Sequence, residues 1–507
     1  LFYIINIIKS VLGRIITLVF MVLGELDLGV LLFNYLTSKF VFIEVFLHIL
    51  AVIVVLNIIR TSKHLSSDIT WIFLIILFPV PATFVFLMTY FNLFINRTFK
   101  SIVKEEKKAV TFLKQDDEVL EDLKKECPTY FQDFMFLKNS NFPIYYNNNF
   151  DYYSPGEKGF PVLLSELKKA KKYIFMEYFI IEEGIMFNSI LDILKEKVKE
   201  GVECRVMYDD MGSLHTLPKS YANVLESYGI KAVTFNKVTP ILSTIMNNRD
   251  HRKILIIDGK VAFSGGVNLA DEYINKNVVH GKWLDNIIRI KGKAVDSMLV
   301  TFLTNWNALR HDDVDYRDFM VEHRVRVKDG FIVPYSETPL DFELTAQSVY
   351  MDILNRAQDY VYIMTPYLII DEEMINCLIH TAKKGVDVKI IVPGIADKKI
   401  IHDIGESYYD QLIRGGVQIY EYRPGFVHAK VFVSDDISSV VGTVNLDYRS
   451  LYLHFENAVL LYKSKKIMDI KKDFLDALDD SIEIKHARFS IVKNFLMSVL
   501  RIFASLL

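Results

Sequence analysis

Two short motifs with matching residue types stand far apart in the chain. Each has a histidine, a lysine two residues later and an aspartate five residues after the lysine, so both read H-x-K-x4-D. The motif residues are His251, Lys253 and Asp258 in the first copy, and His428, Lys430 and Asp435 in the second. An imidazole can serve as a nucleophile or as a general acid and base, and an ammonium group can hold an anion. The motifs therefore indicate chemistry on an anionic substrate.

A glycine and an asparagine follow each motif in the same register. They stand 14 and 17 residues after the histidine, as Gly265 and Asn268 in one half and as Gly442 and Asn445 in the other. A lone H-x-K is more often an exposed strand pair than a site, whereas four matched positions repeated across 177 residues favour a shared function. Glycine permits a close backbone approach, and an asparagine amide there can donate to a phosphate oxygen.

The strand-like residues around both motifs suggest how the groups meet. Residues two apart on a strand project to one face, so each histidine projects together with its lysine. If the two copies pack face to face, one cavity holds two imidazoles, two ammonium groups and two amides. That set suits a phosphodiester, because one imidazole can attack phosphorus while the other protonates the departing alkoxide and then deprotonates the incoming nucleophile. The lysines supply positive charge, and no metal-ligand spacing such as H-E-x-x-H occurs, so we expect neither a metal nor another cofactor.

Each reacting imidazole also needs an acceptor to fix its second nitrogen. Asp285 lies 34 residues after His251, and Glu456 lies 28 residues after His428, so both are candidates to orient a histidine. Ordinary surface salt bridges remain the alternative for these two acids. The motif aspartates fall at strand ends, where we expect mainly structural hydrogen bonds to the turn or to the lysine. The remaining histidines without a repeat partner, namely His215, His280, His402 and His454, are interpreted as ordinary core or surface residues.

Alternating strand and helix patterns surround the motifs and occur twice. Segments 172–181, 189–200 and 201–208 read as strand, helix and strand, and segments 360–370, 373–384 and 385–392 repeat that order. The pattern predicts an α/β protein with two copies of one sandwich domain, over residues 110–329 and 330–485, packed with pseudo-twofold symmetry. Whether the chain forms oligomers is left open.

Apolar residues are concentrated before residue 95. Runs over 15–36, 41–59 and 70–91 predict a transmembrane region over residues 1–95, with a kink at Pro79 and Pro81; a buried hairpin or a cleaved signal peptide is the alternative. More lysine and arginine falls on the side of the following body, which places the catalytic domains in the cytoplasm. Residues 486–507 have helical apolar spacing, and they predict an amphipathic helix that lies either in the membrane interface or against the body.

Composition restricts the functional classes further. Lys plus Arg is 59 and Asp plus Glu is 62, a near-balance that argues against a protein that coats nucleic acid. The three cysteines, Cys127, Cys204 and Cys377, are scattered, which indicates neither a disulfide scaffold nor a thiolate zinc site.

The doubled motif resembles the signature of the phospholipase D superfamily. The stretches RDHRKILIIDGKVAFSGGVNLADEY, GFVHAK and GTVNLDYRS, with the apolar N-terminal region, are similar to bacterial cardiolipin synthases in particular. This resemblance implies transfer of a phosphatidyl group from one phosphatidylglycerol to another in the membrane, which gives cardiolipin and glycerol. It also implies His251 as the nucleophile and His428 as the general acid. A phospholipase D-type hydrolase or a related phosphatidyltransferase is the alternative, and a nucleic-acid phosphodiesterase or an inactive lipid-binding protein is less favoured.

Overall fold

The computed structural model describes residues 41–62, 65–90, 95–146, 149–238, 244–323, 329–486 and 491–503. Its first sheet contains the first motif. From edge to edge it has seven strands, in the order β2 (Phe150–Tyr153), β9 (Ile287–Lys291), β7 (Val261–Gly265), β6 (Lys253–Ile257), β3 (Tyr173–Tyr178), β4 (Glu203–Asp209) and β5 (Lys231–Phe235). β3, β4 and β5 are parallel, and β6 runs antiparallel to β3. The strand that begins at Lys253 therefore lies in the middle of the sheet.

The second sheet repeats this order around the second motif. It runs β1 (Tyr145–Tyr146), β10 (Phe331–Glu337), β19 (Glu456–Tyr462), β17 (Ser438–Gly442), β16 (Val431–Ser434), β11 (Tyr360–Met364), β13 (Asp387–Pro393), β14 (Gln418–Tyr422) and β20 (Ser481–Ile484). The seven strands from β10 to β14 correspond in order and direction to the first sheet, with β1 and β20 added at the edges. The predicted α/β fold with a duplicated unit is confirmed.

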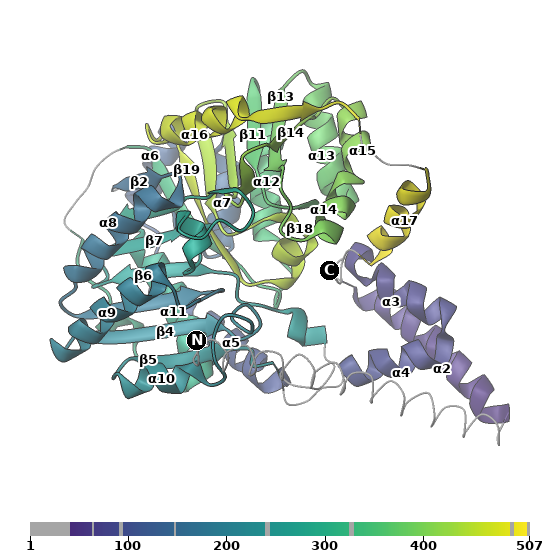
Figure 1. Ribbon diagram of the computed structural model, residues 1–507, viewed down its shortest axis with the longest axis horizontal. Helices are drawn as coiled ribbons and strands as arrows, with labels where there is room; N and C mark the ends of the chain where they lie inside the picture. The colour runs from purple at the N-terminus through teal and green to yellow at the C-terminus, as the bar shows by residue number, and fades with distance from the viewer. Residues whose placement is uncertain are drawn as a thin grey trace.

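Helices separate the two sheets and cover their outer faces. α8 (Gly156–Lys168), α9 (Ile185–Lys199) and α10 (Tyr221–Ser227) cover the first sheet, and α12 (Thr345–Arg356), α13 (Glu372–Lys383) and α15 (Tyr409–Arg414) cover the second (Figure 1). Between the sheets lie α11 (Val295–Arg310) and α16 (Ile467–Asp479), whose apolar residues share one core with both sheets. The layers are thus α–β–α–β–α. Burial of this central core holds the two motifs in a fixed relation.

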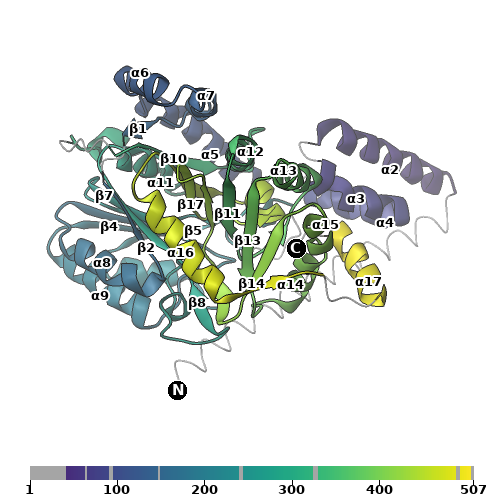
Figure 2. The ribbon, with the colours of Figure 1, turned by 90° about the horizontal axis from the view of Figure 1, so that it is seen from above.

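One segment belongs to a different domain from the one that the sequence indicated. We assigned residues 110–329 to the first domain, but α6 (Asp117–Glu126), α7 (Phe131–Asn139) and β1 pack on the second sheet (Figure 2). The apolar face of α6 joins that core, and Tyr145 of β1 pairs with Ile332 of β10. The order of these segments along the sequence did not indicate this packing, because the chain crosses to the second sheet before it returns to form β2.

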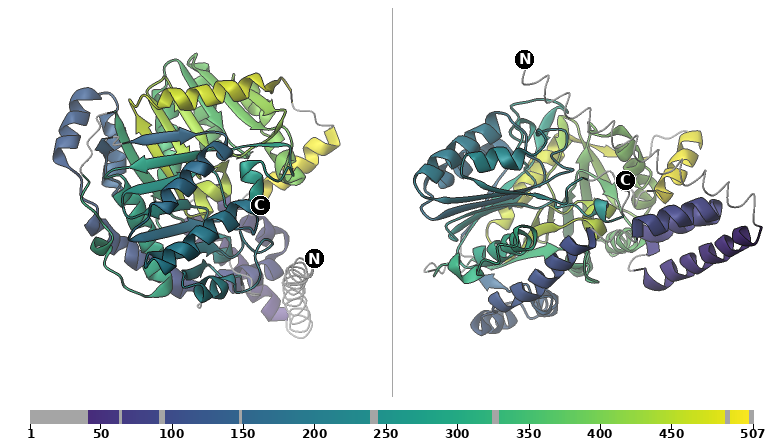
Figure 3. Two further views of the ribbon diagram at one scale, coloured as in Figure 1. Left: turned by 60° about the vertical axis from the view of Figure 1, so that its left-hand side comes forward. Right: turned by 90° about the horizontal axis from the view of Figure 1, so that it is seen from below.

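The first three helices among the described residues project away from both sheets (Figure 3). They are α2 (Val41–Thr61), α3 (Leu65–Leu77) and α4 (Pro79–Tyr90). The kink predicted at Pro79 is present as the break between α3 and α4, since proline cannot continue the hydrogen-bond ladder. Among the described ranges, no helix combines the length and the apolarity needed to cross a bilayer. The predicted span over 15–36 lies outside the described residues.

The predicted C-terminal amphipathic helix is α17 (Ile491–Ile502), and it packs on the protein. Lys493 forms an ion pair with Asp403 of α14 (Lys399–Glu406) at 3.0 Å, and the Arg501 guanidinium lies 3.9 Å from the centre of the Tyr408 ring. On its other side the helix contacts α3, where the Thr70 hydroxyl donates to the Ile502 carbonyl. Phe495 nevertheless remains 73% exposed, so this helix both packs on the body and presents an apolar residue outward.

Candidate active site

The two motif histidines are each paired with a carboxylate from the opposite half of the chain. His251 Nδ1 lies 2.9 Å from both carboxylate oxygens of Glu456, and His428 Nδ1 lies 2.6 Å from Asp285 Oδ2. Both acids are completely buried. From sequence, each acid stood downstream of a histidine in its own half; the structure exchanges these partners. The histidines and their acids therefore form one site that neither half contains alone.

Backbone hydrogen bonds between the two halves determine which acid pairs with which histidine. The His251 N–H donates to the Phe455 carbonyl at 2.9 Å, and the His428 N–H donates to the Leu284 carbonyl at 2.8 Å. Phe455 immediately precedes Glu456, and Leu284 immediately precedes Asp285. In addition, β8 (Lys282–Leu284) of the first half pairs with β15 (Gly425–Val427) of the second. Each histidine thus binds, through its main chain, the strand that presents its carboxylate.

The motif lysines are buried beside their histidines. The Lys253 ammonium donates to the His251 carbonyl at 2.6 Å, and the Lys430 ammonium donates to the His428 carbonyl. Burial, which disfavours the charged form, lowers the pKa of Lys253 to about 7 and that of Lys430 to about 8. The buried carboxylates of Glu456 and Asp285 oppose this loss of charge. Two weakly solvated cations are suited to hold an anionic diester.

Both histidines are held in their neutral form by their surroundings. Burial, followed by the neighbouring lysines, lowers the pKa of His251 well below its ordinary value and lowers that of His428 to about 4. A Nδ1–H that donates to a carboxylate leaves Nε2 as the acceptor, which is the tautomer that a nucleophile needs. An anionic substrate would offset the charge of the lysines and favour protonation of the histidine that acts as the acid.

These pKa values predict how catalysis depends on pH. The positive charges of Lys253 and Lys430 are present below their pKa values and disappear as the pH rises through about 7 to 8. Since kcat/KM reports the ionisation of the free enzyme, we expect it to fall over this range. Initial rates on vesicles measured at a series of pH values test this. A profile that stays flat to about pH 9 would contradict it.

The two motif aspartates have matching structural contacts. Asp258 accepts hydrogen bonds from the backbone N–H groups of residues 171–173, and Asp435 accepts from those of residues 358–360. Each therefore fixes the start of a central strand, β3 or β11. Contacts of this kind agree with the structural interpretation, but the partners are not the turn or the lysine that we expected.

The side-chain amide of each motif asparagine donates one hydrogen bond within the protein. Asn268 Nδ2 donates to the Tyr273 hydroxyl at 2.8 Å, and Asn445 Nδ2 donates to Asp447 at 3.0 Å. Both side chains are buried. Each amide nitrogen carries two hydrogens, so one donor of each is used within the protein. Their predicted role in binding phosphate remains a prediction.

Comparisons with known proteins agree with this geometry. The sequence profile described as "Cardiolipin synthase, PLD-like domain" matches residues 163–302 and 350–478, more than half of the chain. The chain belongs to the cardiolipin synthase family of PLD-like proteins. The two matched segments of this family correspond to the two sheets, so each sheet with its helices is one PLD-like unit.

Several relatives of known sequence share most of their length with this cardiolipin synthase family member. A "Cardiolipin synthase" of Alkalihalophilus pseudofirmus is 31% identical, over 85% of this chain and 86% of its own length. "Cardiolipin synthase 2" of Bacillus anthracis is 32% identical, over 84% of each chain. An uncharacterised protein of Streptococcus mutans is 46% identical, over 84% of this chain and 93% of its own. Among solved structures, a phosphatidylserine synthase of Haemophilus influenzae matches with a TM-score of 0.54 at 16% identity, over 72% of this chain and 95% of that chain, which shows a shared fold.

The structure adds a third histidine to the site, which the sequence interpretation had set aside. The His454 ring lies 5.6 Å from the His251 ring, and His454 Nδ1 lies 3.6 Å from Glu456 Oε1. We had dismissed His454 because it lacks a repeat partner. Its spacing did carry a signal, because His454 stands two residues before Glu456 and has extended backbone, in which residues two apart project to the same face.

Aromatic side chains surround the other histidine. The rings of Tyr273, Trp283 and Phe426 lie 5.2, 5.4 and 6.0 Å from the His428 ring. None belongs to the repeated motif, so sequence reasoning did not find them. Three apolar rings thus border His428, whereas His251 has the Phe179 ring at 5.0 Å and the His454 ring at 5.6 Å.

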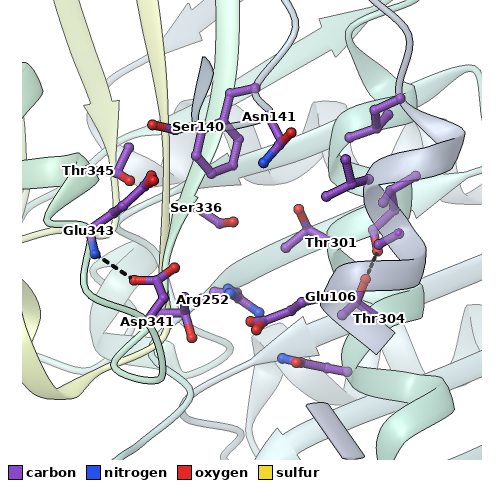
Figure 4. Close-up of a pocket in the computed structure, with 17 residues that line it drawn as sticks. Glu106, Ser140, Asn141, Arg252, Thr301, Thr304, Ser336, Asp341, Glu343 and Thr345 are labelled. Carbon is purple, nitrogen blue, oxygen red and sulfur yellow. Dashed lines mark hydrogen bonds between the residues drawn. The ribbon is translucent and has the colours of Figure 1, made fainter. Parts of the chain in front are cut away.

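A separate cavity lies on the opposite side of the first motif strand. It has a volume of about 160 Å³, and its lining includes Glu106, Arg252, Thr301 and Asp341 (Figure 4). Arg252, which stands between His251 and Lys253 in the sequence, lines this cavity, and it donates to the Glu456 carbonyl at 3.2 Å. Burial raises the pKa of Glu106 to about 7. The motif histidines and lysines do not line this cavity.

Two groups among the described residues bring enough nitrogen and oxygen ligands together for a metal ion. They are His251 with His454 and Glu456, and His402 with Glu406 and Glu421. In the first group the Glu456 carboxylate already accepts from His251 and from the Thr443 hydroxyl, and the charge of Lys253 is adjacent. A nearby ammonium disfavours a second cation. The positive charge that a diester needs is supplied by Lys253 and Lys430.

Proposed function

We propose that this protein is a cardiolipin synthase that transfers a phosphatidyl group from one phosphatidylglycerol to another. The observation that carries the proposal is the pair of crossed histidine–carboxylate contacts, which brings two neutral imidazoles and two ammonium groups into one buried site. Such a site suits in-line displacement at phosphorus, with one imidazole on the attacking side and one on the leaving side.

In the first step Nε2 of one histidine attacks phosphorus, and the bond from phosphorus to the glycerol headgroup breaks. By the family resemblance the attacking residue is His251, and His428, which takes up a proton on Nε2 when the anionic diester binds, gives that proton to the departing glycerol oxygen. The products are a phosphatidyl-histidine and free glycerol. Lys253, Lys430, Asn268 and Asn445 stabilise the equatorial oxygens, and Glu456 and Asp285 stabilise positive charge on the imidazoles.

In the second step a free hydroxyl of another phosphatidylglycerol gives its proton to His428, which is now neutral. Its oxygen attacks phosphorus, the bond to His251 breaks, and cardiolipin leaves. Both histidines return to their initial protonation states, so the cycle consumes two phosphatidylglycerol molecules and gives one cardiolipin and one glycerol. The proposal involves no metal, no other cofactor and no nucleic acid.

The second candidate is a hydrolase of the same superfamily, in which water resolves the phosphatidyl-histidine. Chemistry up to that intermediate is identical, so the site residues keep their roles. Closely buried rings around His428 favour the transferase, because an apolar surrounding disfavours water and accommodates a lipid.

Incubation of the full-length enzyme with phosphatidylglycerol vesicles separates these two functions. We expect cardiolipin and glycerol to form in equal amounts, since each transfer releases one headgroup. Lipid analysis by mass spectrometry, with an enzymatic glycerol assay, measures both. Phosphatidate as the main product would support the hydrolase, and the absence of both products would reject the proposed chemistry.

We also propose that the enzyme works at the cytoplasmic surface of the cell membrane, with residues 1–95 as its membrane region. A lipid substrate favours this, since each methylene moved into water costs about 0.8 kcal/mol. The large apolar residues of α2 that face outward support it: Phe42, Val45, Phe46, Ile49, Val52, Ile53, Leu56 and Ile59. Lysine and arginine near the start of the catalytic body support the cytoplasmic orientation.

A further inference from the structure

The glycerol headgroup leaves on the His428 side of phosphorus, since His428 protonates the departing oxygen in the reaction proposed above. Two aromatic rings connect this histidine with an acid outside both motifs. The Phe426 ring lies 6.0 Å from the His428 ring, and the Tyr367 ring lies 6.3 Å from the Phe426 ring. The Tyr367 hydroxyl donates to Asp397 Oδ2 at 2.6 Å. A tyrosine and a carboxylate therefore lie on the side that receives the headgroup.

The same pair lies close to the groups that would bind the phosphate. Burial, followed by Asp397 and then by Asp447 and Tyr273, raises the pKa of Tyr367 well above its ordinary value, so its hydroxyl stays a donor. Asp447 and Tyr273 are the acceptors to which the two motif asparagines donate. Burial lowers the pKa of Lys430 to about 8, and the charge of Asp397 is among those that oppose this change. These interactions place the acid beside the site.

Asp397 keeps one carboxylate oxygen available for a ligand. Oδ2 accepts from Tyr367 and lies 3.9 Å from the Lys398 ammonium, whereas no group in the described part of the chain donates to Oδ1. The side chain is 18% exposed, so a ligand in the site can reach it. A carboxylate near a phosphodiester repels its negative charge, so this acid suits a neutral group that donates a hydrogen bond. An alcohol is such a group.

The equivalent loop of the first half uses its acids differently. β4 and β13 have the same place in the two sheets, and the loop after β4 begins at Asp209 and Asp210. Asp209 accepts from three backbone N–H groups, and Asp210 accepts from the N–H of Val238. These acids hold the main chain, whereas Asp397 has a free acceptor. The two halves therefore differ as the reaction requires, because only one side of phosphorus receives an alcohol.

We propose that Asp397 is a subsite for the free hydroxyls of the glycerol headgroup, and that it makes the enzyme prefer phosphatidylglycerol to lipids whose headgroup lacks those hydroxyls. This inference rests on the proposed function and adds a specificity-determining residue to it. A hydrogen bond to a charged acceptor is stronger than one between neutral groups. The hydroxyls are carried one and two carbons beyond the carbon that bears the ester oxygen, so they can extend past His428 toward Asp397.

Competition between two donor lipids tests the subsite. Vesicles that hold the full-length enzyme contain unlabelled phosphatidylglycerol with equal traces of two donors labelled in the headgroup, phosphatidylglycerol and phosphatidylpropanol, which lacks both free hydroxyls. The ratio of labelled glycerol to labelled propanol, measured by mass spectrometry, gives the preference, and both donors share one acceptor. We expect Asp397→Leu, which keeps the approximate size and removes the acceptor, to lower this preference at least about tenfold.

Asp397→Asn is the matched control, because its amide keeps a polar partner for a hydroxyl, and it should keep the preference within about threefold of the wild type. If thermal unfolding shows that Asp397→Leu does not fold, Asp397→Ala serves in the same assay. A residue that only supports the fold or the charge of Lys430 would slow the release of both headgroups alike. An unchanged preference in the apolar variant would therefore overturn the inference. Failure of the wild type to release glycerol at all would instead reject the proposed function.

Discussion

Replacement of His251 or of His428 by alanine is expected to lower cardiolipin formation by about 10⁴-fold or more. Each variant removes a group that the reaction needs, because one histidine carries the phosphatidyl group and the other transfers the proton. Both imidazoles lie in the same buried site, so neither can be replaced by bulk water. Initial rates on phosphatidylglycerol vesicles measure the effect.

His215→Ala is the matched control for these two variants, since His215 is exposed and outside the site. It should keep wild-type activity. Retention of more than about one hundredth of the wild-type rate by either motif variant would contradict the two-histidine mechanism. Rapid quenching of the wild-type reaction, followed by peptide mass spectrometry, should locate the phosphatidyl group on His251.

Replacement of Glu456 or Asp285, the acids paired with the histidines, is expected to cause the next largest loss of activity. Glu456→Gln and Asp285→Asn should each lower kcat by about 10² to 10⁴-fold, because an amide no longer favours the reactive tautomer or stabilises the charged imidazole. Both substitutions keep the size of the side chain, so the buried site should remain folded. Rates on vesicles, with thermal unfolding as the control, measure this.

The exchange of partners makes a further distinction possible. In a histidine side-chain NMR spectrum, Glu456→Gln should shift the Nδ1 proton of His251, and Asp285→Asn should shift that of His428, since these pairs lie at 2.9 and 2.6 Å. If Glu456→Gln instead shifted the Nδ1 proton of His428 and left that of His251 unchanged, each acid would pair with the histidine of its own half, and the crossed pairing would be wrong.

Much of the fold was predictable because the duplicated patterns are local. The predicted strand over 172–181 contains β3, and the predicted helix over 373–384 overlaps α13 almost completely. Segments whose position depends on distant contacts were not predictable in this way. The assignment of residues 117–146 to the first domain was wrong, because their partners are in the second sheet.

The site was predictable where it repeats and not where its symmetry is broken. The matched spacing of His251 and His428 indicated that both face one cavity, but the pairing of their acids depends on backbone contacts across the interface. His454 and Trp283 occupy equivalent positions with different residue types, so a search for repeats could not find them. The site of a duplicated protein is thus most informative where the copies differ.

The crossed contacts also affect how the enzyme would lose activity under stress. Both histidine–carboxylate pairs span the boundary between the two halves, so a slight separation of the halves removes the two supporting acids at the same moment. Inactivation in mild denaturant would then precede the melting of either sheet, and turnover would report whether the halves are docked.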